Sequence, residues 1–334
     1  MSSQICRPQN LRRQCVAIAT CVVCIGLVAA RPALSQSASR QGIWSERAQI
    51  GEPRTEAAVV FASGRLYMIG GMARGMDSDT LTQEYDPKTD RWRERAPLPH
   101  ALSHPGAAVL NGRIVVVGGF LRNVHVEAQD LVFEYTPASN SWRALSPLKS
   151  PRGSVGVVAL NGRIHAIGGR DRQRGTVATH EVFDPATGRW SDLAPLPRAR
   201  DHFAVAVADG LIHVIGGRLN TPAENVNDHD VYDPKTNTWT TAAPLPSARS
   251  GGLGVVYKGR IIVAGGECNN GTPFTDTDAY DPTAGTWSRL TPMPSGRHGI
   301  TAATDGQVVY APGGAPACAT ASSETLLTFR LPSD

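Results

Sequence analysis

Five arginines recur at a nearly constant interval along the chain and are the first candidates for binding chemistry. Arg152, Arg200, Arg249 and Arg297 are separated by 48 or 49 residues, and Arg54 lies 98 residues before Arg152. A guanidinium group presents a planar fork of N–H donors that matches a carboxylate in two parallel hydrogen bonds. If the fold brings these positions together, the arginines form a ring suited to an acidic sugar or to a peptide Asp or Glu. The alternative is structural, with each arginine bracing neighbouring units through backbone carbonyl groups.

Acidic and imidazole groups accompany the arginines. Asp201 and His202 directly follow one of them, His298 directly follows another, and His104 stands at the position equivalent to His202 in an earlier repeat. Imidazole exchanges protons near neutral pH, so these groups are further candidates for ligand contact. Glu267 directly follows a pair of glycines and is a weak candidate for a catalytic acid or base beside the arginines.

Two cysteines, Cys268 and Cys318, are predicted to form a disulfide. They lie 50 residues apart, in equivalent loops of successive repeats, and the other four cysteines all fall within residues 1–35. Two cysteines in neighbouring loops of an exported protein pair more often than they stay free. No sequence motif supplies a base for either thiol, so neither is expected to be a nucleophile.

Other residues of metal-binding or catalytic type lack a telling pattern. His229 stands between two aspartates in a segment predicted to be a strand, where successive side chains point to opposite faces. His100, His104, His202 and His298 could hold a transition metal, but no carboxylate or thiol stands at a suitable spacing. The sequence also carries no phosphate-binding loop, dinucleotide fingerprint or nucleophile-elbow serine. We therefore expect no metal and no cofactor.

The elements that must position these residues recur in six units. A pair of glycines closes an apolar run in every unit, and a tryptophan stands 26 residues before each pair. An aromatic residue stands seven positions before each tryptophan after the first. The pairs begin at Gly70, Gly118, Gly168, Gly216, Gly265 and Gly313, and the tryptophans are Trp44, Trp92, Trp142, Trp190, Trp239 and Trp287. A fixed period of 48 to 50 residues is the mark of a repeat architecture.

Each unit has the pattern of four short strands. In the second unit an apolar stretch at residues 107–110 is followed by Asn111-Gly112 and a second apolar stretch at 114–117. Asn-Gly between two apolar runs is a strong signal for a tight hairpin. A third strand follows around residues 132–135, and a fourth carries Trp142. With 34 glycines and 24 prolines in 334 residues, the composition also favours an all-β chain with many turns.

Four-stranded units with this order of glycine pair, aromatic residue and tryptophan resemble kelch repeats, over residues 43–329. The resemblance implies a six-bladed β-propeller with four antiparallel strands per blade. It also implies structural roles for the repeated residues: the glycine pair permits close packing of blades, and the aromatic residues fill the space between them.

The two ends of the repeat region complement each other. The sixth unit stops before the position of its own tryptophan, whereas Trp44 precedes the first complete unit. We therefore predict that residues 43–48 supply the last strand of the sixth blade and close the ring, which removes free sheet edges.

The first 35 residues have the order of a secretory signal peptide. Arginines at 7, 12 and 13 precede an apolar run from residue 16 to residue 30, and small residues follow. The run is shorter than the roughly 20 residues that a membrane-spanning helix needs. We expect residues 1–35 to be removed, residues 36–334 to form one domain, and the product to be periplasmic or secreted without membrane insertion.

Charge argues against nucleic acid as a partner. The chain has 33 basic and 29 acidic side chains, but four of the basic ones lie in residues 1–35, which leaves 29 of each sign. A general basic field is therefore absent from the mature chain.

Three classes of function remain open. The first is a binding module that recognises a protein or a carbohydrate, acidic ones included, on its loop face. The second is a sugar-active enzyme, because the periplasmic sialic-acid mutarotases are also similar to six-unit kelch chains. The third is a copper oxidase of the kind that contains kelch repeats, which the six units and the missing ligand pattern disfavour.

Overall fold

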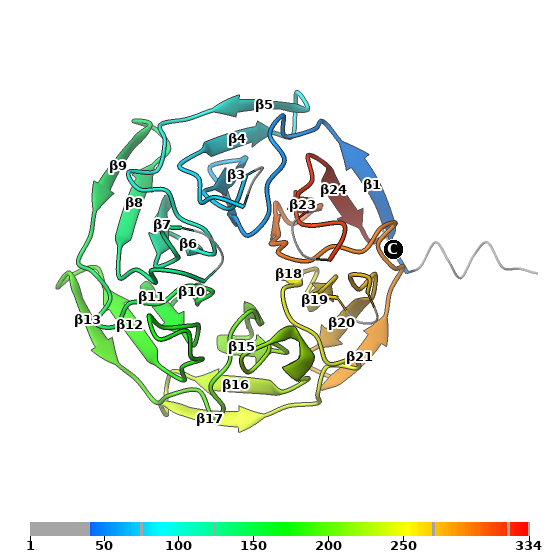
Figure 1. The fold of residues 1–334 in the computed structure, drawn as a ribbon. Coiled ribbons are helices and arrows are strands. Elements are labelled where there is room, and N and C mark those ends of the chain that lie inside the picture. The colour runs from blue at the N-terminus through cyan, green and yellow to red at the C-terminus, as the bar shows by residue number, and fades with distance from the viewer. Residues whose placement is uncertain (1–40, 74–75, 123–124, 269–270, 319–320, 333–334) are drawn as a thin grey trace, which may run out of the picture. The chain divides into compact units, whose positions relative to one another are not determined.

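The computed structural model describes residues 41–332, apart from 74–75, 123–124, 269–270 and 319–320. The described residues form six antiparallel sheets of four strands, arranged as blades around a channel (Figure 1). This confirms the predicted six-bladed propeller. The predicted signal peptide, residues 1–35, lies outside the described residues. No helix among the described residues is long and apolar enough to cross a membrane.

In five blades the strands run in sequence order from the channel outward, and in the sixth the N-terminal strand takes the outermost place. The innermost strands are β2 (Ala58–Ala62), β6 (Gly106–Leu110), β10 (Gly156–Leu160), β14 (Ala204–Ala208), β18 (Leu253–Tyr257) and β22 (Ala303–Thr304). The second strands are β3 (Arg65–Ile69), β7 (Arg113–Val117), β11 (Arg163–Ile167), β15 (Leu211–Ile215), β19 (Arg260–Ala264) and β23 (Val309–Pro312). The third strands are β4 (Thr82–Asp86), β8 (Val132–Thr136), β12 (His180–Asp184), β16 (His229–Asp233), β20 (Thr277–Asp281) and β24 (Leu326–Arg330). The outermost strands are β5 (Arg91–Glu94), β9 (Ser141–Ala144), β13 (Arg189–Asp192), β17 (Thr238–Thr241), β21 (Thr286–Arg289) and β1 (Ile43–Arg47), and one short helix, η1 (Pro222–Glu224), lies between β15 and β16.

Tight turns join the first and second strands, as the sequence predicts. Between β6 and β7, Asn111 and Gly112 have φ values of 51° and 74°. Two consecutive residues with positive φ define a turn whose twist matches that of the flanking strands. The same pair of residue types makes the equivalent turn between β10 and β11, at Asn161 and Gly162.

The glycine pairs set the contact between successive blades. Gly216 has a φ of +66°, and a Cβ atom on it would lie 2.6 Å from the carbonyl oxygen of Arg249 in the next blade. The N–H of its neighbour Gly217 donates to that same carbonyl at 3.0 Å. Both the positive φ and the close approach require glycine. The contact recurs all the way round and closes where the N–H of Gly314 donates to the carbonyl of Arg54 at 2.9 Å.

The tryptophans tie each outer strand to the preceding blade. Trp92 Nε1 donates to the carbonyl of Ala48 at 2.9 Å, and Trp142 Nε1 donates to that of Ala96 at 2.8 Å. Each tryptophan also packs against the aromatic residue of its own blade, as Tyr85 does with Trp92 at a ring-centroid distance of 5.1 Å. These contacts confirm the predicted structural roles of both aromatic positions.

The N-terminal strand closes the ring. Strand β1 pairs antiparallel with β24, with Trp44 opposite Phe329, and the two strands lie side by side in Figure 1. Trp44 Nε1 donates to the carbonyl of Thr291 in the fifth blade at 3.0 Å, so the first strand repeats the contact that the other tryptophans make. The predicted ring closure is confirmed.

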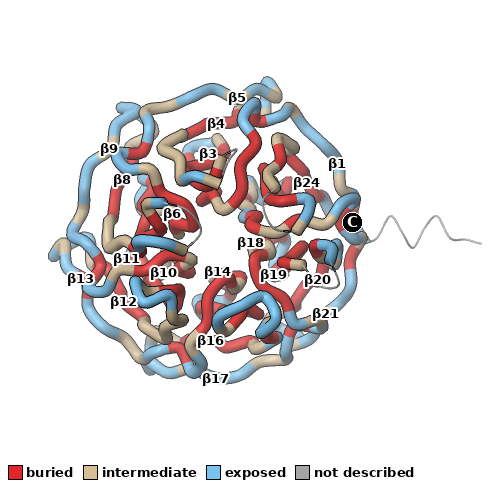
Figure 2. Tube along the Cα trace, viewed as in Figure 1, coloured by how far each residue is buried: buried red, intermediate tan, exposed pale blue. Residues whose placement is uncertain are grey.

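Apolar side chains fill the spaces between blades. One such cluster combines Val60 and Ile69 of the first blade with Ile114 and Val116 of the second, all with at most 6% of their surface exposed. Exposed residues follow the outermost strands and the loop tips, while the inner strands are largely buried (Figure 2). The residues that precede the innermost strands therefore stand at one end of the channel, held by packed blades on all sides.

Candidate functional site

The five predicted arginines lie inside the blades. Arg54, Arg152 and Arg200 have no exposed surface, and Arg249 and Arg297 are 2% and 6% exposed. Arg152 donates to the carbonyl of Ala166 at 3.0 Å and to the carboxylate of Glu181 at 2.6 Å. None of the five lines the channel cavity described below. This placement fits the bracing alternative, and it does not support the expectation of a ligand-facing arginine ring.

Four of the five arginines follow a common rule in their choice of partner; Arg297 does not, because Leu327 stands at the partner position of its blade. The arginine bonds a polar side chain two positions before the aromatic residue of its blade, as the pairs Arg200–Asp230 and Arg249–Asp278 show at 2.8 and 2.7 Å. Arg54 likewise donates to the Gln83 amide oxygen at 2.5 Å. In the second blade both members are apolar, since Leu102 and Phe133 occupy these positions and are buried. In that blade the two positions are replaced together, as expected for a structural pair.

Replacing Arg152 with methionine is expected to destabilise the fold by about 3–5 kcal/mol, because Glu181 would be left as an unpaired buried charge. Arg297 is the matched control. Its hydrogen bonds go to Ser295 Oγ and to the carbonyl of Gly296, so its replacement leaves no carboxylate unpaired. Urea unfolding of Arg152→Met and Arg297→Met measures the difference. Equal losses in the two variants would contradict the assignment of the first as a buried ion pair.

One position of the repeat does face the channel. It lies twelve residues after each tryptophan and is occupied by Glu56, His104, Ser154, His202, Gly251 and Gly299. All six residues have positive φ, between 51° and 66°. Backbone bonds link the blades here: the N–H of His104 donates to the carbonyl of Glu56 at 2.9 Å, and the N–H of Ser154 donates to that of His104 at 3.0 Å. We call this ring of six residues the channel mouth.

A cavity of about 190 Å³ extends from the channel mouth into the channel. All six channel-mouth residues line it, and deeper in the channel the wall is made by small and apolar residues of the innermost strands. These include Val59, Ala107, Val157, Val205 and Ala302. The cavity is therefore polar at one end and apolar along its length.

A network of ion pairs supports the channel mouth from behind. Arg218 Nε donates to Asp201 Oδ1 at 2.9 Å, and its Nη1 contacts the carboxylate of Glu267, with 2.5 Å to Oε1. Arg170 Nε donates to the other oxygen of Asp201 at 2.7 Å. Ser250 Oγ donates to Glu267 Oε2 at 3.1 Å. Both carboxylates are thus matched by guanidinium groups, and Glu267 is an ion-pair partner here.

Three histidines meet in front of this network. His104 and His202 belong to the channel mouth, and His125 reaches them from the loop between β7 and β8. One ring nitrogen of each lies within 4.8 Å of those of the other two. His202 Nδ1 donates to Asp201 Oδ1 at 2.6 Å, since a carboxylate can only accept. Arg218 Nη2 lies 3.2 Å from the Nε2 atoms of both His125 and His202.

Burial shifts the pKa values of these groups away from their ordinary ranges. Desolvation raises the pKa of Glu56 to about 8, with repulsion from Glu267 adding to the effect and Arg218 opposing it. Desolvation lowers the pKa of His202 well below its usual value, and the positive charge of Arg218 lowers it further. Desolvation likewise lowers the pKa of His104. The site therefore combines a carboxyl group that holds its proton with imidazoles that stay neutral.

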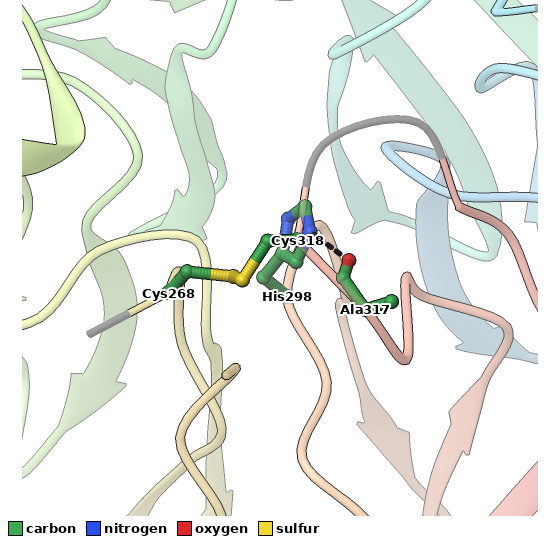
Figure 3. The surroundings of a disulfide bond; sticks show 4 residues. All are labelled: Cys268, His298, Ala317 and Cys318. Atoms are coloured by element: carbon green, nitrogen blue, oxygen red, sulfur yellow. Dashed lines mark hydrogen bonds between the residues drawn. A yellow bond between two sulfur atoms is a disulfide. The ribbon is translucent and has the colours of Figure 1, made fainter. Parts of the chain in front are cut away.

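The remaining predicted residues lie outside the channel mouth. Cys268 and Cys318 stand at disulfide distance and link the loops of the fifth and sixth blades, beside His298 (Figure 3). His298 Nε2 donates to the carbonyl of Ala317 at 3.1 Å and does not line the cavity. His100 is exposed and stacks on Phe133.

The sequence analysis missed His125, Arg170 and Arg218. The two arginines, like Glu267, directly follow a glycine pair, and the backbone there pairs with the residue before the channel mouth, as Asp201 does with Arg218. Comparing the residue after each glycine pair across the six units would have found both arginines. His125 lies in a loop without an equivalent residue in the other repeats, so no repeated signal points to it.

Comparisons with known proteins agree with this architecture. Residues 107–314 match the family model described as the KLHDC2/KLHL20/DRC7 Kelch-repeats domain, and residues 53–99 match the Kelch motif. Among solved structures, one titled "Structure of YjhT" is 18% identical, with a TM-score of 0.72, and the match covers 85% of this chain and 99% of that chain. Identity at this level supports a shared fold alone. No curated protein matches the chain. Because the first of these models spans more than half of the sequence, the chain belongs to the Kelch-repeat family.

Proposed function

We propose that this protein is an exported binding protein that holds a small, hydroxyl-rich ligand, a carbohydrate, at the channel mouth. The observation that carries the proposal is the set of carboxyl, imidazole and hydroxyl groups of Glu56, His104, Ser154 and His202 around one cavity. A concave site with a few polar groups above an apolar wall is the usual form of a small-molecule site. Sugar hydroxyls both donate and accept hydrogen bonds, so they suit such a mixed set.

The charges of the site favour a neutral sugar over an acidic one. Arg170 and Arg218 already bond the carboxylates of Asp201 and Glu267. An anionic ligand would have to compete with these buried carboxylates for the same guanidinium groups. The cavity of about 190 Å³ also suits a single sugar ring better than a protein segment.

Export is supported by the cysteine pair. Disulfides persist in oxidising compartments and are rare in the cytosol. The sulfur atoms of Cys268 and Cys318 lie at disulfide distance, which fits the predicted signal peptide. We therefore propose a periplasmic or secreted location.

A second candidate is a sugar isomerase of the mutarotase type. Ring opening of a sugar needs one group that takes the proton of the anomeric hydroxyl and another that gives a proton to the ring oxygen. Glu56 Oε2 lies 3.5 Å from His104 Nε2, and His202, which is hydrogen-bonded to Asp201, lines the same cavity. A carboxyl group and an oriented imidazole are thus available to one bound sugar.

A thermal-shift screen of the purified protein tests the proposal. We expect neutral monosaccharides to raise the melting temperature, because a ligand at 100 times its Kd stabilises the folded state by about 2.7 kcal/mol. The affinity derived from these shifts should fall at least tenfold in His202→Gln. It should stay unchanged in His100→Gln, which alters an exposed ring away from the cavity. If no sugar shifts the wild type, or only acidic sugars do, the proposal of a neutral sugar site fails. Exchange of the two anomers of a sugar that binds, followed by NMR, separates an isomerase from a binding protein.

A further inference from the structure

We propose that His104, His125 and His202 form a binding site for a divalent transition metal of the Zn²⁺ type. Each histidine offers one ring nitrogen, and these nitrogens lie within 4.8 Å of one another. Imidazole is a preferred ligand of Zn²⁺ and its neighbours in the first transition row, and three protein ligands leave a fourth position open. The proposal goes beyond sugar binding and reverses the sequence-based expectation of no metal.

The spacing of two of the nitrogens matches the geometry of such a site. His125 Nε2 and His202 Nε2 are 3.4 Å apart. Two nitrogens bound to Zn²⁺ at about 2.0–2.1 Å in a tetrahedral arrangement lie roughly 3.4 Å from each other. The two side chains come from different blades, since His125 follows β7 and His202 precedes β14. The tertiary fold, and not the local alternation of a strand, therefore brings them to this distance.

A carboxylate orients one of the proposed ligands. His202 Nδ1 donates to Asp201 Oδ1 at 2.6 Å, which leaves Nε2 as the nitrogen that carries the lone pair. Asp201 is itself held by Arg170 and Arg218. A carboxylate that accepts from the far nitrogen of a histidine is the usual outer partner in zinc sites, where it fixes the tautomer and the ring orientation.

The histidine lone pairs already converge on a positive group. A guanidinium can only donate, so Arg218 Nη2 donates to the Nε2 atoms of both His125 and His202, at 3.2 Å each. The guanidinium therefore occupies the lone pairs that a metal ion would need. A metal ion would take over these lone pairs, while Arg218 keeps its bonds to Asp201 and Glu267 through Nε and Nη1.

The third histidine has an unused nitrogen. His104 is 6% exposed, and its Nδ1 is buried without a hydrogen-bond partner among the described residues. A buried polar atom without a partner costs free energy, and an ion bound by Nδ1 would supply that partner. Of the three carboxyl groups around the cluster, that of Glu56 holds its proton, and the carboxylates of Asp201 and Glu267 balance the guanidinium groups of Arg170 and Arg218. The charged side chains around the cluster therefore sum to about zero.

Titration of the untagged, metal-stripped protein with Zn²⁺ and with Co²⁺ tests the proposal. We expect one equivalent of Zn²⁺ to bind in calorimetry, and Co²⁺ to give the strong visible absorption of a tetrahedral site. His125→Ala should weaken binding at least tenfold, and because His125 lies in a loop outside the blades, this variant should fold. His100→Ala is the matched control, since it removes an exposed histidine, and it should bind as the wild type does.

Two results would overturn the proposal. One is the absence of stoichiometric metal uptake by the wild type. The other is unchanged affinity in His125→Ala with a melting temperature equal to that of the wild type. Since no sugar is present in this titration, its failure would leave the sugar-binding proposal standing, and failure of the sugar screen would leave the metal site standing.

Discussion

Removal of residues 41–47 is expected to destabilise the propeller by more than about 5 kcal/mol and to broaden its unfolding transition. Two losses add up here. Trp44 is partly buried, packs on Phe329 and donates to the fifth blade, so its loss costs part of the about 3–5 kcal/mol that a fully buried large aromatic side chain contributes. The hydrogen bonds between β1 and β24 are lost as well, at about 1 kcal/mol each. The sixth blade would also expose β24 as a free edge, which favours aggregation.

Calorimetry of the truncated and intact proteins checks this result. Ile43→Ser is the matched control, because Ile43 lies in the same strand but is 59% exposed, and its replacement should leave the melting temperature nearly unchanged. Trp44→Ala should fall between the control and the truncation. A truncated protein that melts cooperatively at the parent temperature would show that β1 does not close the ring in solution.

Acidification from pH 6.5 to pH 4 is expected to remove about 6 kcal/mol of stability, from two buried histidine pairs. His165 Nδ1 lies 2.9 Å from His180 Nε2, and His213 Nδ1 lies 3.0 Å from His229 Nε2. Desolvation lowers the pKa of His165, His213 and His229 to about 4 and that of His180 to about 3. The unfolded chain binds protons below its ordinary pKa of about 6.5, whereas the folded chain does so only near pH 4. If one proton is counted for each pair, each pair therefore contributes about 3 kcal/mol to the free energy of unfolding. This contribution is present above pH 6.5 and is lost as the pH falls.

Denaturant unfolding at several pH values between 7 and 4 measures this loss. Replacing one pair, as His213→Gln with His229→Gln, should remove about 3 kcal/mol of the loss on acidification, because glutamine keeps a donor and does not titrate. His100→Gln changes an exposed histidine and should leave the slope as it is. If the double replacement leaves the slope unchanged, the pairs do not hold their neutral form in the folded protein.

The fold could be predicted because its determinants are repeated. Glycine pairs and tryptophans act on the backbone and on the space between blades, so the same requirement appears six times in the sequence. Ring closure could be predicted from the same repeat, because the N-terminal strand supplies the tryptophan that the last unit lacks. The hairpin turns carry local signals, such as Asn111-Gly112, that depend on φ alone.

The site could be predicted only in part. Position within the repeat identified His104, Asp201 and His202, which the structure brings to the channel mouth or directly behind it. The direction in which Arg200 points could not be deduced, because the same residue type suits a ligand or a buried Asp230. His125 stands in a loop whose length and sequence vary between units, so only the tertiary structure shows which residues it meets.

At the channel mouth, backbone atoms hold the blades in register, and side chains are left to contact the ligand. The register of the blades there rests on backbone groups, such as the bond from the N–H of Gly251 to the carbonyl of His202. The six positions already hold four residue types, Glu, His, Ser and Gly, at nearly the same φ. An engineer could therefore exchange side chains at Glu56 or Ser154 to recognise a different molecule, while the frame that presents them is kept by atoms that every residue shares.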